Sequence, residues 1–97
     1  MTSYPDNFDP TEVRKNVRTA MLRILEERGP TKTACPSTIA KEVSGTGWEQ
    51  LMPVVREVAK QLASEGQIQV TQRGEPVDPV DVTGPIRIGI TRSSKIE

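Results

Sequence analysis

The sequence lacks the residues that most enzymes and metal sites use. It contains no histidine and one cysteine, Cys35, among its 97 residues. Without histidine, the commonest general base and metal ligand is missing. A position just before a helix can lower the pKa of a thiol, but a lone cysteine is more often a half-buried structural residue, and we interpret Cys35 in that way. The sequence therefore predicts a protein that is not an enzyme and needs no cofactor.

Disulfides, long apolar runs and targeting signals are missing as well. A single cysteine excludes an intramolecular disulfide, which suits a reducing compartment. No apolar run approaches the length of a membrane span. Residues 1–10 lack the charged start and apolar run of a signal peptide. We expect a cytoplasmic protein that makes no membrane contact.

The chain also has no net charge and few aromatic residues. It has 13 basic and 13 acidic side chains, and aromatic residues make up 3%. The core must therefore be aliphatic, and a chain of this size forms one domain of modest stability. A dedicated nucleic-acid-binding protein is usually basic, because neutralising phosphates drives its affinity. The charge balance thus opposes strong nucleic-acid binding.

What the sequence does have is hydrophobic periodicity. Residues 9–12, DPTE, combine a capping residue, a first-turn proline and an acid at capping-box spacing. Apolar residues then recur at helical spacing until Gly29 and Pro30 stop the helix. This apolar set is Val13, Val17, Ala20, Met21, Ile24 and Leu25. The next residues, 31–35, predict a short extended piece.

Two further helices are predicted. Residues 36–45 form the first of them, which starts with a proline and stops at a glycine, and residues 48–65 form the second. Thr46 and Glu49 have capping-box spacing at the start of the later helix. Pro53 either bends that helix or marks its true first turn; the sequence leaves both open.

After Gly66 the apolar period changes to two. Isoleucine and valine alternate with polar residues over 68–71 and again over 86–91. These two strands predict an antiparallel hairpin. Its long connection holds Pro76, Pro79 and Pro85, which limit its freedom and lower the entropy cost of holding a shape.

The element order predicts an α+β fold that is mainly α: a winged helix-turn-helix with three helices and a small antiparallel β-hairpin wing. Residues 9–91 form this domain, between an N-terminal arm, 1–8, and a C-terminal tail, 92–97. Tyr4 and Phe8 are expected to hold the arm against the domain. A plain three-helix bundle is the alternative, less favoured because it exposes the isoleucines of the last strand.

Three segments carry a resemblance to a known family. They are CPSTIAKEV at 35–43, LMPVVREVAKQLASEGQIQVTQRG at 51–74 and DPVDVTGPIRI at 78–88. Over residues 12–91 the chain resembles an uncharacterised bacterial family of small proteins, a domain of unknown function whose members look like winged helix-turn-helix domains. The resemblance implies the fold and no activity.

The fold directs attention to a DNA-binding role. In a winged helix the third helix normally enters the major groove, and the wing touches backbone or minor groove. The candidate contacts are Thr46, Gln50, Arg56, Lys60, Gln61 and Arg73. Glutamine can read adenine edges, arginine and lysine can bind guanine or phosphate, and a helix N-terminus can hold a phosphate. We expect a transcription-related module for double-stranded DNA, and a homodimer would double its contacts.

The wing itself opposes this function. Between residues 72 and 85, Arg73 is the one base against Glu75, Asp78 and Asp81. We expect Arg73 to contact a phosphate or to pair with Asp78 or Asp81 as a brace. The two aspartates do not have the ligand pattern of a calcium loop. The alternative function is a protein–protein interaction module with the same fold and no nucleic-acid binding, in which the charges of the third helix are a solvated face. In either case we interpret Trp48 as a core residue.

Overall fold

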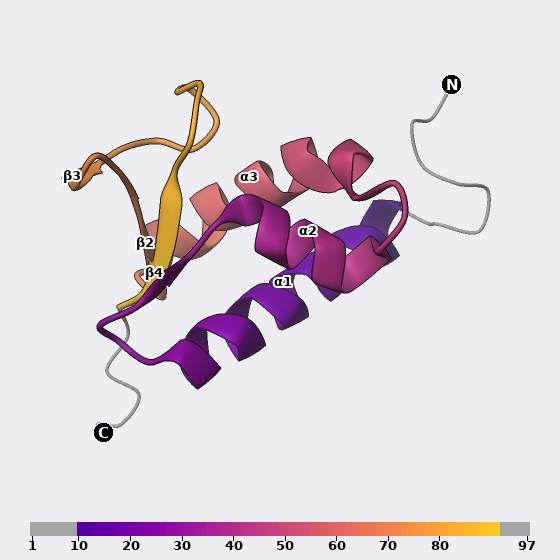
Figure 1. Cartoon of the computed structure of the whole chain (residues 1–97), viewed down its shortest axis with the longest axis horizontal. Coiled ribbons are helices and arrows are strands. Elements are labelled where there is room, and N and C mark those ends of the chain that lie inside the picture. Colours follow the sequence, from indigo (N-terminus) through magenta and orange to yellow (C-terminus); the bar gives the residue numbers. More distant parts are fainter. Residues whose placement is uncertain (1–9, 92–97) are drawn as a thin grey trace.

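The computed structural model describes residues 10–91. The predicted cap at Asp9, the arm with Tyr4 and Phe8, and the tail from residue 92 lie outside the described residues. The elements are α1 (Pro10–Arg28), β1 (Thr33–Ala34), α2 (Pro36–Ser44), the 3₁₀ helix η1 (Trp48–Leu51), α3 (Met52–Ser64), β2 (Ile68–Gln72), β3 (Glu75–Pro76) and β4 (Arg87–Ile90). Figure 1 shows the three α-helices packed together with the sheet at one end.

The first two helices form where apolar spacing and stop signals predict them. α1 buries its whole predicted apolar stripe and ends before Gly29, whose φ of 89° is left-handed. α2 starts with Pro36, at a position where no backbone N–H is needed. The extended piece between these helices is the short strand β1.

The start of the third helix differs from the prediction. The chain first makes the 3₁₀ turn η1, and α3 begins at Met52 with Pro53 in its first turn. Pro53 therefore marks the start of the helix and does not bend it. The prediction that Thr46 and Glu49 form a capping box is wrong. Gly47, left-handed with a φ of 77°, occupies the cap position, and no side chain bonds to the free N–H groups there.

The sheet has four antiparallel strands in the order β1-β4-β2-β3, two more than the predicted hairpin. β4 lies between β2 and β1, which places Ile88 opposite both Val70 and Ala34. These apolar residues face the core. The alternate row, Thr33, Gly89 and Gln69, faces away from it and begins the outer face of the sheet.

The wing is a tight hairpin followed by a loop. β2 and β3 are joined by the two residues Arg73 and Gly74, and Val77 extends the pairing by donating to the Val70 carbonyl at 3.0 Å. Residues 77–86, called the wing loop below, then return to β4. The sequence predicted a single long connection here, because β3 has two residues and no alternation that periodicity could detect.

The core lies between the three helices and the inner face of the sheet. It is aliphatic, as the composition requires, and it includes Met21, Leu25, Ile39, Leu62 and Ile88. Three helices against a small antiparallel sheet, with a protruding hairpin and loop, make an α+β protein with a winged-helix-like layout (Figure 1). Burying the isoleucines of the last strand in this core is what excludes a plain three-helix bundle.

Candidate nucleic-acid interface

The six residues predicted to contact DNA do not form one surface. The α2–α3 connection, which holds Thr46, and strand β3, which follows Arg73, lie at opposite ends of the molecule in Figure 1. Gln50 is exposed in η1. Gln61 is exposed on α3. The remaining two, Arg56 and Lys60, face the wing loop.

Arg56 holds the wing loop against α3. Its guanidinium donates three hydrogen bonds to backbone carbonyls, to Pro79 at 2.9 Å, to Val82 at 3.0 Å and to Gly84 at 2.7 Å. The residue is half-buried, and Pro79 beside it is buried. These bonds use most of the donors of the guanidinium. Arg56 is therefore a structural connection between helix and wing, and it has few donors left for a nucleic acid.

Lys60 makes a second connection to the same loop. Its ammonium lies 2.9 Å from the Asp78 carboxylate, whose other oxygen accepts the backbone N–H of Val80 at 2.8 Å. The hydrogen bond and charge of Asp78 raise the pKa of Lys60, and the hydrogen bond from Lys60 lowers the pKa of Asp78. Lys60, and not Arg73, thus pairs with a wing aspartate.

The charges on the helices largely cancel one another. Arg14 of α1 pairs with Glu57 of α3 at 2.7 Å, and Arg18 pairs at 2.9 Å with Glu65, just after α3. The hydrogen bond from Arg18 lowers the pKa of Glu65. Arg23 similarly pairs with two acids, on α1 and α2. The exposed seams between the helices are therefore close to neutral.

Positive charge remains on the outer face of the sheet. Three cations in this region, Lys32, Arg73 and Arg87, form no ion pair within residues 10–91; they are called the sheet cations below. Lys32 lines a shallow hollow on the outer face with Gln69 and Gly89. Arg73 and Arg87 line a second hollow at the base of the wing. The side chains around them are mostly neutral, and Glu75 is the nearest acid in the hairpin.

Two of the sheet cations were missed by sequence reasoning. The signal for Arg87 was present, because it alternates with the buried Ile86 and Ile88 and must therefore face solvent. Its guanidinium donates to the Thr33 hydroxyl at 2.9 Å and to the Cys35 sulfur at 3.2 Å. Lys32 had no such signal, since its place beside the outer face depends on the pairing of β1 with β4.

Other candidate chemistry is accounted for by local structure. Cys35 is half-buried just before α2, as expected for a structural residue. Trp48 packs against the core while Lys41 lies 4.8 Å from its ring centre, a cation–π contact. Among residues 10–91 there is no group of three acids or cysteines that could hold a metal ion. No helix in that range is long and apolar enough to cross a membrane.

Comparison with known proteins identifies a family and no activity. The family model described as a protein of unknown function (DUF3253) matches residues 14–91. This range contains α2, α3, the whole sheet and nearly all of α1. No curated protein matches the chain significantly.

Proposed function

The chain belongs to that family of proteins of unknown function, and we propose that it is a DNA-binding module that contacts phosphates through the outer face of its sheet. The observation that supports this proposal is a difference in pairing: Arg14, Arg18 and Arg23 on the helices are paired with acids, whereas the three sheet cations form no ion pair within residues 10–91. A neutral protein can bind a polyanion when several unpaired cations lie on one face. A cytoplasmic location and a bacterial origin belong to the same proposal, supported by the single cysteine and the family resemblance.

The proposal moves the contact surface away from α3. Arg56 and Lys60 are engaged by the wing loop, so η1 and α3 offer mainly Gln50 and Gln61, respectively, for reading bases. Among the predicted contacts that carry a positive charge, Arg73 is the one that is exposed and forms no ion pair within the described chain. In this arrangement, phosphate contacts position the protein and supply most of the affinity, with little readout of sequence.

Salt dependence of binding tests the proposal. The affinity for a mixed-sequence duplex is measured by fluorescence anisotropy between about 50 and about 200 mM salt, where three phosphate contacts predict a log–log slope of about −3. Arg73→Ala should reduce the magnitude of that slope by about 0.9. Lys15→Ala is the matched control, because it removes one exposed positive charge from α1 and should leave the slope unchanged. Absence of binding at the lowest salt concentration would overturn the proposal.

One observation favours protein interaction as a second candidate function. Val80, in the wing loop, is 47% exposed, a large fraction for an apolar side chain. It borders a groove of about 320 Å³ that Met52, Pro53 and Glu57 also line. An apolar side chain at a groove is the kind of anchor that a partner protein uses. If the salt titration finds no DNA binding, this groove becomes the preferred interaction site.

A further inference from the structure

The turn between β2 and β3 holds an arginine in an unusual conformation. Arg73 has a φ of 55° and Gly74 a φ of 82°, so both residues of the two-residue loop are left-handed. Such turns favour Asn-Gly, because asparagine and glycine tolerate this conformation best. An arginine at the first position is uncommon. Backbone strain of this kind is found preferentially at functional sites, so the guanidinium of Arg73 is the feature to explain.

The wall opposite Arg73 has its acceptors already occupied. The amide nitrogen of Gln72 donates to the Thr83 carbonyl at 2.8 Å and to the Pro85 carbonyl at 3.2 Å. The carbonyl between them, of Gly84, accepts the 2.7 Å bond from Arg56. Three consecutive carbonyls are thus satisfied from within the protein. The polar groups of this wall that form none of these bonds include the N–H groups of Thr83 and Gly84 and the Thr83 hydroxyl. All of them can donate a hydrogen bond.

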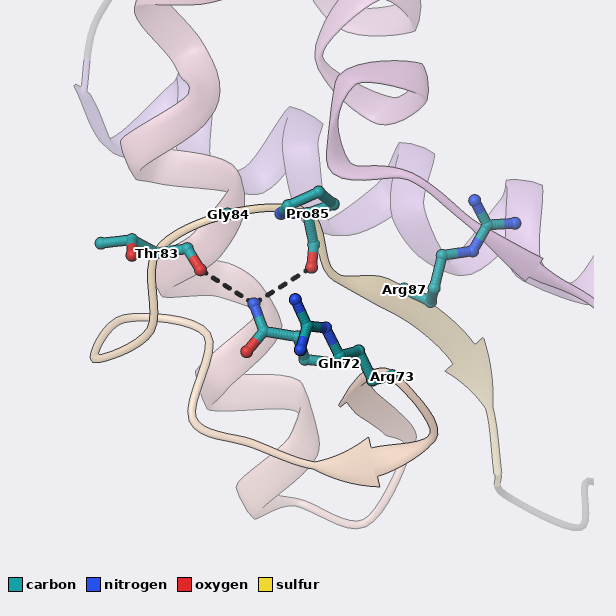
Figure 2. A pocket seen from close by; sticks show the side chains of 6 residues that line it. All are labelled: Gln72, Arg73, Thr83, Gly84, Pro85 and Arg87. Carbon is teal, nitrogen blue, oxygen red and sulfur yellow. Dashed lines mark hydrogen bonds between the residues drawn. The ribbon is translucent and has the colours of Figure 1, made fainter.

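These groups border a hollow of about 490 Å³ at the base of the wing. Figure 2 shows Gln72 and Arg73 side by side, with Gln72 bonded to the segment 83–85 and its amide oxygen turned away from the Arg73 guanidinium. Arg87 also lines the hollow, but it points away from the other two (Figure 2), towards its partners Thr33 and Cys35. Its stem contributes to the rim, and its guanidinium lies to one side of the hollow.

We propose that this hollow is a binding site for a small oxyanion, a carboxylate or a phosphate, with Arg73 as its principal ligand. The guanidinium offers the paired donors that match two oxygens of such a group. Occupied carbonyls make the opposite wall more compatible with an anion than free ones would be. Arg87 adds a second positive charge near the hollow. Glu75 lies opposite Gln72 in the β2–β3 ladder and does not line the hollow; its negative charge weakens the binding of an anion. The site does not depend on DNA binding.

An NMR titration of the whole chain without DNA tests the site. Sodium phosphate and sodium acetate are added separately at constant ionic strength, with chloride as the balancing anion. Saturable shifts are expected for the backbone amides of Arg73, Gly74 and Gly84, whereas Thr19 on α1 should not move. Saturation with one anion alone identifies that class of ligand. Non-saturating or uniform shifts with both anions would overturn the proposal.

Two substitutions separate binding from folding. Arg73→Asn suits the left-handed turn better than arginine, so it should keep or raise the thermal midpoint while weakening anion binding by about tenfold or more. Glu75→Gln removes the opposing charge and should strengthen binding by about twofold to fivefold. Equal affinity in the Arg73→Asn variant and the parent protein would exclude Arg73 as the ligand, whatever the outcome of the DNA measurements.

Discussion

Arg56 forms three hydrogen bonds between the helical body and the wing loop, beside the ion pair of Lys60 with Asp78. Arg56 donates to three carbonyls of this loop and has no carboxylate partner among residues 10–91. Arg56→Met keeps most of the apolar stem and removes all three bonds, so we expect the free energy of unfolding to fall by about 2 kcal/mol. Urea denaturation measures this change. Arg14→Met is the control, because an exposed ion pair such as that with Glu57 contributes at most about 1 kcal/mol.

The same substitution distinguishes two roles for Arg56. If Arg56 were a DNA contact, Arg56→Met would leave stability near that of the control and reduce the salt slope of DNA binding. If Arg56 is a structural residue, Arg56→Met should lower the stability well below that of the control and leave the salt slope unchanged. Helical periodicity correctly predicted that Arg56 lies outside the stripe of α3 that packs into the core. It could not show what Arg56 faces, because the path of the wing loop depends on contacts 23 to 28 residues away in sequence.

At the scale of elements, the wing loop should depend on pH. The hydrogen bond from Lys60 lowers the pKa of Asp78 below its ordinary 3.8, so the pair stabilises the loop above that value and is lost as pH falls through the lowered pKa. Lys60 has a raised pKa, so its contribution persists to pH values above 10.5 and is lost only when the ammonium deprotonates. The loop should therefore be held at neutral pH and loosen in acid.

The acid transition can be followed in the chemical shift of the Val80 amide, which donates to Asp78. A titration from pH 6 to pH 2 should give a midpoint below 3.8, and Lys60→Met should move that midpoint upward. A midpoint unchanged by the substitution would show that Lys60 does not hold the loop. Asp78→Asn provides the control, because the chemical shift of the Val80 amide should show no such transition in that variant.

Elements were predicted to the extent that local patterns specify them. The three helices and strands β2 and β4 follow from apolar spacing, glycine stops and proline starts. β1 was predicted as a short extended strand, but its partner was not, because its pairing with β4 joins residues more than 50 apart. β3 and the 3₁₀ turn η1 were missed. β3 has only two residues, and η1 continues directly into α3, so that its apolar residues continue the helical pattern of α3.

At the scale of the whole molecule, net charge and charge distribution give different expectations. The pI of about 6.3 and the net charge of zero predict weak interaction with polyanions. Pairing of Arg14, Arg18 and Arg23 with acids, against the unpaired sheet cations, predicts one positive face. The sequence could not reveal this difference, because it depends on which charges the fold brings together.

Heparin chromatography at pH 7.5 measures this positive face directly. We expect the protein to be retained at low salt although the pH lies above its pI, because a sulfated resin responds to local charge. The triple variant Lys32→Ala, Arg73→Ala, Arg87→Ala should lose retention. Its matched control is Arg14→Ala, Arg18→Ala, Arg23→Ala, which has the same net charge but keeps the sheet cations. If the column retains the control and does not retain the first variant, the distribution of charge, and not the net charge, governs binding. Elution of both variants at the same salt concentration would contradict the positive face on which the proposed DNA binding rests.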